Sequence, residues 1–356
     1  MRTLTHAGGA GFKPALSWMA ALIVLTMFLS ACNRAQVFHR EAYVFGTRVD
    51  VAVYGDEPER ADAAMAAVLR EFDRMHRAYH AWEPSELTAL NAALAQGETL
   101  EVSAELAAML RDAQQMAAQG DGLFDPALGA VIELWGFHTD TFEPKRPDAH
   151  QLAALIEQAP RISQLLIEGQ RVSSTNPAVR LDLGGYAKGY ALDRAANILR
   201  DQGIHHALIN IGGNVLALGD KGGRPWRIGI QHPRQPVPLA TMPLYDGEAI
   251  GTSGDYQRYF ELDGVRYAHI IDPRSGEPAH GTQALTVLVT SRPRVGTLSD
   301  AASKPAYLAG EEWRDQTRHF AIDHALRVAG DGRIEVTRAL RARLEFPQPV
   351  AFKVID

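Results

Sequence analysis

Hydrophobic and polar positions follow two different periods along this 356-residue chain. Apolar residues spaced by three and four predict amphipathic helices over residues 58–77, 103–119, 151–158, 187–202, 297–308 and 338–343. Alternating or continuous apolar runs predict strands over residues 41–54, 206–218, 226–230, 256–262, 265–271, 285–289, 320–328 and 333–336, where Gly212-Gly213-Asn214 divides 206–218 into two strands. Asp263-Gly264, between two of these strands, is a strong hairpin signal. The first strand is interrupted at Phe45-Gly46-Thr47, where the glycine is typical of a bulge or a close backbone approach. The proline-rich residues 231–243 predict a loop.

These strands come in clusters with helices between them, rather than in strict strand–helix–strand alternation. This order predicts an α+β fold with largely antiparallel sheets flanked by helices. No G-x-G-x-x-G follows a predicted strand and no G-x-x-x-x-G-K-[ST] is present, which argues against the Rossmann and P-loop folds. With 46% apolar and 22% charged residues, the chain can bury the core of one large domain or of two intimately joined ones. The net charge of −6 argues against a nucleic-acid binder.

The N-terminal residues differ from the rest of the chain. Residues 1–31 combine a basic start with a short apolar run, which predicts a signal peptide. Cys32, the only cysteine, follows at once and resembles the lipid-attachment site of bacterial lipoproteins; a chance cysteine near an ordinary cleavage site is the alternative. We expect residues 32–40 to be a lipid-anchored linker, 41–346 the folded domain and 347–356 a C-terminal tail. The protein would then be exported and anchored to a bacterial membrane facing the periplasm, with inner and outer membrane both open.

The central stretch 181–193 reads L-D-L-G-G-Y-A-K-G-Y-A-L-D and leads into a predicted helix. A glycine-rich turn before a helix exposes backbone N–H groups and the positive end of the helix dipole, which suits a phosphate. Lys188 adds a positive charge there and Asp182 a carboxylate. An ordinary strand-to-helix turn whose lysine faces water explains the pattern equally well.

Residues 76–82 carry two further candidates. His76 and His80 have the i, i+4 spacing of a metal pair, but no third ligand is obvious nearby, so we interpret them as surface histidines. Trp82 lies in a predicted loop, where it could stack on a flat ligand or simply cover the core.

Several short motifs, each weak alone, occur in one specific order. They are Phe45-Gly46-Thr47, Ser85-Glu86-Leu87 with Asn91, Phe124-Asp125-Pro126, Leu134-Trp135-Gly136-Phe137, Asp182-Leu183-Gly184-Gly185 with Ala187-Lys188-Gly189, Gly212-Gly213-Asn214, Gly251-Thr252-Ser253-Gly254, His269-Ile270-Ile271-Asp272-Pro273 with Gly276, and Asp300-Ala301. In this order, behind a lipoprotein signal, they resemble the FAD:protein FMN transferase family, the ApbE-type flavin transferase lipoproteins. The resemblance runs from about Phe45 to the C-terminal helix.

The resemblance implies a two-lobed, T-fold-like α+β unit that binds FAD in a cleft between two intertwined lobes. It implies cleavage of the FAD pyrophosphate, attachment of FMN through its phosphate to a threonine or serine hydroxyl of an acceptor flavoprotein, and release of AMP. Mg²⁺ is the implied cofactor, and the implied acceptor is a flavoprotein subunit of a membrane redox complex.

By the same resemblance, His269 is the candidate base that takes the proton of the acceptor hydroxyl. The candidate FAD contacts are Phe45, Trp82, Leu123, Phe124, Asp125, Asp182, Lys188 and Ile270, where Trp82 stands at a position that is often tyrosine. Lys188 could pair with a phosphate or fix Asp182. The candidate metal positions are Gly185, through its carbonyl oxygen, Asp300, Ser303 and Lys304.

Lys304 is a departure from the family pattern, because the residue four positions after the metal aspartate is usually threonine. A protonated lysine cannot ligate a metal. Ser303 or water could fill the position, or the ammonium could stand where a cation would sit. We therefore expect weaker metal binding than in threonine-bearing relatives.

Three other functions compete with the transferase. A hydrolase would use the same site to split FAD with water as the acceptor. A non-catalytic lipoprotein would only bind and deliver flavin. The presence of the acidic residues and His269 argues against this alternative. An unrelated periplasmic solute-binding lipoprotein would usually show alternating strands and helices, which this sequence lacks.

Overall fold

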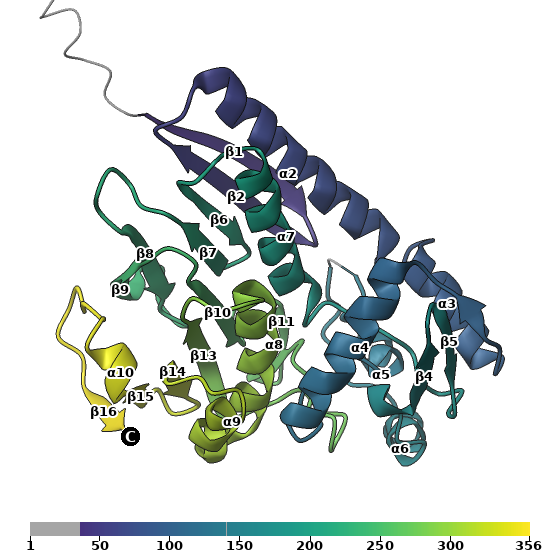
Figure 1. Cartoon of the computed structure of the whole chain (residues 1–356). Helices are drawn as coiled ribbons and strands as arrows, with labels where there is room; N and C mark the ends of the chain where they lie inside the picture. The colour runs from purple at the N-terminus through teal and green to yellow at the C-terminus, as the bar shows by residue number, and fades with distance from the viewer. Residues whose placement is uncertain (1–35, 140) are drawn as a thin grey trace, which may run out of the picture. The chain divides into compact units, whose positions relative to one another are not determined.

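A mixed nine-stranded sheet forms the centre of the computed structural model, which describes residues 36–139 and 141–356 (Figure 1). In sheet order, the strands are β1 (Val37–Val44), β2 (Thr47–Tyr54), β6 (Ala207–Ile211), β7 (Asn214–Leu218), β10 (Ala249–Gly254), β13 (Thr282–Val289), β14 (His324–Ala329), β15 (Ile334–Thr337) and β16 (Phe352–Ile355). Every neighbouring pair is antiparallel except β15 and β16. The prediction of an α+β fold with largely antiparallel sheets is confirmed.

Helices cover one face of this sheet. They are α2 (Pro58–Ala78), α7 (Ala187–Asp201) and α8 (Val295–Leu308). Because successive side chains of a strand point to opposite faces, Val51 joins the core beneath these helices, whereas its neighbour Ala52 joins the core on the other face. That second core is closed by the hairpin of β8 (Trp226–Gln231) and β9 (Pro238–Leu244) and by α10 (Arg338–Arg341).

Helices α7 and α8 meet at two glycines. A Cβ atom on Gly189 would collide with the carbonyl oxygen of Gly296, and one on Gly296 would lie 2.6 Å from the carbonyl oxygen of Gly189. Only glycine permits this backbone-to-backbone approach. It places the first turn of α7 against the segment of α8 that carries Asp300.

The elements between α2 and α7 in the chain extend the helical layer (Figure 1). They are α3 (Glu86–Ala95), α4 (Ala104–Gln119), α5 (Gly129–Leu134), α6 (Ala149–Glu157), the 3₁₀ turn Ile162–Gln164, and the small sheet of β3 (Leu100–Glu101), β5 (Arg171–Ser174) and β4 (Leu165–Glu168). A second 3₁₀ turn (Gly310–Glu312) and α9 (Trp313–His319) follow α8. Residues Val37–Asp356 form one compact unit.

A third apolar cluster fastens the hairpin of β11 (Tyr259–Leu262) and β12 (Val265–Ala268) to the segment after α5. Trp135 stacks on Tyr267 with ring centroids 5.6 Å apart, and its indole N–H donates to the carbonyl of Gly276 at 2.8 Å. This packing matters for the site, because Arg258 precedes β11 and His269 follows β12, so the two residues lie side by side at the open end of the hairpin.

Several local expectations were wrong. Phe45 and Gly46 form a two-residue hairpin turn rather than a bulge, since both have positive φ, 57° and 65°, as tight turns between antiparallel strands require. Residues 231–243 contain β9, whose prolines are tolerated because an edge strand need not donate every N–H. β1 begins inside residues 32–40, expected to be linker, and β16 lies inside residues 347–356, expected to be a tail.

The predicted signal peptide (1–31) and the lipid-attachment residue Cys32 lie outside the described residues. Within residues 36–139 and 141–356, none of the helices combines the length and apolar character needed to cross a bilayer.

Candidate active site

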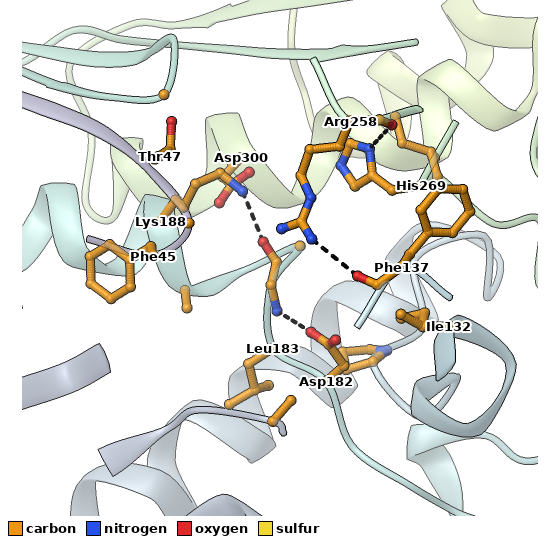
Figure 2. A pocket seen from close by; sticks show the side chains of 18 of the residues that line it. Phe45, Thr47, Ile132, Phe137, Asp182, Leu183, Lys188, Arg258, His269 and Asp300 are labelled. Carbon is orange, nitrogen blue, oxygen red and sulfur yellow. Dashed lines mark hydrogen bonds between the residues drawn. The ribbon is translucent and has the colours of Figure 1, made fainter. Parts of the chain in front are cut away.

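A cavity of about 700 Å³ brings together predicted site residues from distant parts of the chain. Asp182, Lys188, His269 and Asp300 all line it (Figure 2). The volume lies within the range of roughly 300–1,000 Å³ typical of small-molecule sites. The other predicted residues that line the cavity are Phe45, Trp82, Leu123, Phe124, Asp125, Gly185, Ile270 and Lys304. Ser303 is not among the lining residues, and Cys32 lies outside the described residues.

The central stretch builds one wall of the cavity. A carboxylate oxygen of Asp182 accepts from the Gly184 N–H at 2.7 Å, which holds the turn, and Lys188 Nζ donates to the Gly184 carbonyl at 2.9 Å (Figure 2). Burial raises the pKa of Asp182, although the Gly184 N–H and the nearby positive groups oppose this shift. The predicted helix is confirmed as α7.

The N-terminus of α7 holds a carboxylate of the protein itself. The Gly189 N–H donates to Asp300 Oδ2 at 2.8 Å. The sequence suggested that backbone donors here would face a phosphate; one of them is instead taken by Asp300, which is fully buried. A carboxylate at this position is stabilised by the same N–H groups and dipole that would stabilise a phosphate.

The β11–β12 hairpin presents His269. Both its backbone N–H and its Nδ1 lie 3.1 Å from the carbonyl oxygen of Arg258. A carbonyl oxygen can only accept, so Nδ1 carries the proton and Nε2 has the lone pair. Burial, followed by the positive charges of Arg258 and Lys188, lowers the pKa of His269 to about 3. The imidazole is therefore neutral near pH 7 and can accept a proton at Nε2.

Arg258 lines the same cavity and was missed by the sequence reasoning. Its Nη2 donates to the carbonyl of Phe137 at 3.0 Å (Figure 2) and to that of Thr139 at 3.3 Å. These two bonds fix the guanidinium. A signal was present in the sequence. Counting back from the Asp263-Gly264 turn across the predicted hairpin places Arg258 beside His269.

The metal candidates lie on α8. Lys304 Nζ is ion-paired with Asp300 Oδ1 and also donates to the Asp300 backbone carbonyl at 2.8 Å. Burial would raise the pKa of Asp300, but the charges of Lys188 and Lys304 outweigh it and lower this pKa. Burial lowers the pKa of Lys304 to about 8. Ser303 turns away, because its Oγ donates to the Asp300 carbonyl and lies 2.7 Å from Ser253 Oγ.

The apolar wall explains some of the predicted FAD contacts better than others. Phe45, Phe124 and Ile270 offer hydrocarbon surface. One face of Trp82 is covered, since the Arg180 guanidinium lies 4.9 Å from its ring centroid. The side chain of Asp125 is 2% exposed, and its Oδ1 accepts from the backbone N–H groups of Ala127 and Ile162, so this oxygen holds the loop although the residue lines the cavity. Burial raises the pKa of Asp125 to about 6.

His76 and His80, interpreted from the sequence as surface histidines, both line the cavity, with ring centroids 5.0 Å apart. His80 Nδ1 accepts from the backbone N–H groups of Trp82 and Glu83, so it is not available to a metal. Across residues 36–139 and 141–356, no group of three or more histidine, cysteine, aspartate or glutamate residues is arranged to hold a metal ion.

Comparison with known proteins fits this geometry. The ApbE family model matches residues 45–324. A FAD:protein FMN transferase of Rhodobacter capsulatus is 42% identical over 354 residues, which are 98% of this chain and 66% of that protein, so this chain spans just under two thirds of its length. A Vibrio cholerae protein of the same name is 31% identical over 304 residues, covering 83% of this chain and 88% of the relative.

Solved structures show the same similarity. The ApbE protein of Thermotoga maritima superposes with a TM-score of 0.77 at 31% identity, over 88% of this chain and all of that one. The Pseudomonas stutzeri flavinyl transferase ApbE, in its apo form, gives 0.75 at 29% identity over 89% and 98% of the two chains. The family match, the relatives and the shared fold together establish that this chain belongs to the ApbE family.

Proposed function

We infer that this chain is a FAD:protein FMN transferase. The observation that carries this inference is the cavity in which a neutral histidine with its lone pair on Nε2, His269, faces the positive side chains of Lys188 and Arg258. A proton acceptor beside fixed positive charge is what transfer of a phosphoryl-linked group requires. The activity of the relatives supports the same reaction.

The proposed step moves FMN from one oxygen to another. The hydroxyl oxygen of an acceptor threonine or serine attacks the FMN phosphorus of FAD, forming a new P–O bond. The bridging P–O bond breaks and its electron pair leaves with AMP. The hydroxyl proton passes to His269 Nε2, while Lys188 and Arg258 stabilise negative charge on the phosphate oxygens.

Binding of FAD would also tune the base. The pKa of His269 is lowered to about 3 by burial and by the charges of Arg258 and Lys188. A diphosphate between these cations would offset their effect, so the pKa of His269 should rise when FAD binds. A base closer to neutral pKa accepts the hydroxyl proton more effectively near pH 7.

Magnesium is the cofactor that the family resemblance implies, and the residues present do not fit it as they stand. Both carboxylate oxygens of Asp300 already have partners, Gly189 and Lys304, and Ser303 is turned away from the cavity. We propose that this chain binds magnesium more weakly than relatives with threonine at the position of Lys304.

We further propose that the protein is exported, lipid-anchored at Cys32 and faces the periplasm of a bacterial membrane. The apolar run that ends at Cys32 supports this proposal. The acceptor would then be a flavoprotein subunit of a membrane redox complex exposed on the same side of the membrane.

The test of the activity is a mass measurement. The full chain, extracted in detergent, is incubated with FAD and a membrane-protein extract of the bacterium that carries it, and the proteins are digested and analysed by mass spectrometry. A threonine or serine peptide that gains the mass of FMN less one water, together with AMP release, supports transfer. Release of AMP with free FMN and no modified peptide would favour the FAD pyrophosphatase, and FAD retained uncleaved would favour a flavin-binding lipoprotein.

A further inference from the structure

The ion pair between Lys304 and Asp300 lines the cavity, and the reaction step described above gives it no role. We propose that the ammonium of Lys304 takes the place of a divalent cation on Asp300, so that FMN transfer by this chain proceeds without a bound metal ion. The proposal rests on the proposed function and assigns the electrostatic role at this end of the cavity to a side chain.

The position of Lys304 is the first argument. Its Nζ contacts two oxygens of Asp300, the carboxylate Oδ1 and the backbone carbonyl. Its Cε lies 3.6 Å from the place where a Cβ atom on Gly185 would sit. The side chain therefore runs between Gly185 and Asp300, the two positions between which a metal ion would be held.

A metal ion and this ammonium exclude one another. Mg²⁺ binds oxygens at about 2.0–2.1 Å and in proteins relies on carboxylates. The only carboxylate of α8 at this point is Asp300, whose Oδ2 is held by the Gly189 N–H and whose Oδ1 is paired with Lys304. Binding a divalent ion would separate the pair and leave a second cation beside the first, with the Lys304 side chain only 16% exposed to water.

The ammonium also retains a donor for the substrate. Lysine carries three N–H groups, and Asp300 engages two of them. Lys304 lines the cavity, so the third is available to a phosphate oxygen of FAD. The Lys304–Asp300 pair has no net charge, whereas a divalent ion on the same carboxylate would carry one positive charge. More of the stabilisation therefore falls to Lys188 and Arg258, which line the same cavity.

The test compares wild type with Lys304→Thr, which supplies a neutral hydroxyl, and with Lys304→Met, which supplies no ligand. Lys145→Thr is the matched control, since Lys145 forms an exposed ion pair with Glu143. FMN transfer is measured in EDTA and over a magnesium series. Binding of Mn²⁺ alone is measured separately, by loss of the free-ion signal in electron paramagnetic resonance.

We expect wild type and the control to transfer FMN equally in EDTA and in magnesium. Lys304→Thr should lose transfer in EDTA and regain it with magnesium, and should bind Mn²⁺ about tenfold or more tightly than wild type. Lys304→Met should lose transfer in EDTA and regain little. Equal Mn²⁺ affinity in wild type and Lys304→Thr, or loss of wild-type transfer in EDTA, would overturn the proposal. Absence of transfer by every protein in every condition would instead overturn the proposed function, and the Mn²⁺ affinities would still decide the role of Lys304.

Discussion

Two buried ion pairs in this protein resemble each other in chemistry and differ in what surrounds them. Arg327 and Glu335 face each other across β14 and β15, 3.0 Å apart, with side-chain exposures of 2% and 6%. Arg327 also donates to Thr282 and to the Gly281 carbonyl, and Trp313 donates to Glu335. Both charged side chains of this pair therefore have all these partners within the protein.

The Lys304–Asp300 pair is built differently. Its carboxylate is completely enclosed, but its ammonium borders the cavity together with Lys188. This difference distinguishes ion pairs that stabilise the fold from ion pairs that can act on a ligand. A pair whose donors and acceptors all have protein partners stabilises the sheet, whereas a pair with one side open to a cavity can act on a ligand.

The largest expected effect concerns the cavity. His269→Ala should lower the rate of FMN transfer by about 10²–10⁴-fold, because it removes the base but no phosphate contact. FAD binding, measured by flavin fluorescence, should persist. His150→Ala changes an exposed histidine of α6 and should transfer at the wild-type rate. Transfer by His269→Ala at more than about a tenth of the wild-type rate would count against His269 as the base.

The next effect concerns the closed pair. Arg327→Met should lower the free energy of unfolding by about 3–5 kcal/mol, because it leaves Glu335 buried without a cation. Urea denaturation measures this change, and the transfer rate per folded molecule should stay at the wild-type value. Arg333→Met, on the same hairpin but 59% exposed, should change the unfolding midpoint little. The prediction would be contradicted if Arg327→Met kept the wild-type free energy of unfolding but transferred FMN more slowly than wild type.

The smallest effect concerns Asp125, a buried carboxylate held by N–H groups, with its nearest cation, Arg161, 4.0 Å away. Its pKa is raised from 3.8 to about 6 by burial, so the folded protein binds a proton that the unfolded chain has released. This contribution to stability is complete below about pH 3.8 and is lost as the pH rises through about 6.

Asp125→Asn keeps the acceptor oxygen and removes the titration. It should therefore be more stable than wild type at pH 7, on the order of 2 kcal/mol, with the advantage vanishing near pH 4. Denaturation midpoints at several pH values measure the difference. Asp263→Asn, at the exposed hairpin turn, should follow the wild-type curve. Parallel curves for wild type and Asp125→Asn would show that Asp125 is ionised in both states.

The sequence was a good guide wherever local chemistry decides the structure. Apolar periodicity placed α2, α4 and α7 within a few residues, the Asp263-Gly264 signal marked a real hairpin, and Gly212-Gly213 divides two strands as expected. Ordered motifs indicated which residues meet in the cavity. It failed at β9, whose prolines predict a loop, and at β16, which is only four residues long and lies at the end of the chain. Both are strands because they pair with a neighbouring strand.

Side-chain orientation within the site was the second limit. Asp125 and Ser303 were both candidate site residues, yet Oδ1 of Asp125 binds two backbone N–H groups and Oγ of Ser303 binds the Asp300 carbonyl and Ser253. The partner of Lys304 could be suspected from its i, i+4 spacing to Asp300 but not assigned, because Glu and Asp elsewhere in the chain compete for it. Arg258 was within reach of the sequence, since a hairpin register can be counted from its turn.

The contact between Gly189 and Gly296 has a consequence for how the substrate site can vary. The main chains of α7 and α8 touch there with no side chain in between. Lys188 adjoins one glycine, and Lys304 lies two turns of helix beyond the other. The spacing of the two lysine attachment points is thus set by the main chain and not by an adjustable rotamer. We therefore expect related proteins to differ here in which side chains stand at the positions of Lys188 and Lys304, while the distance between the two main-chain positions stays constant.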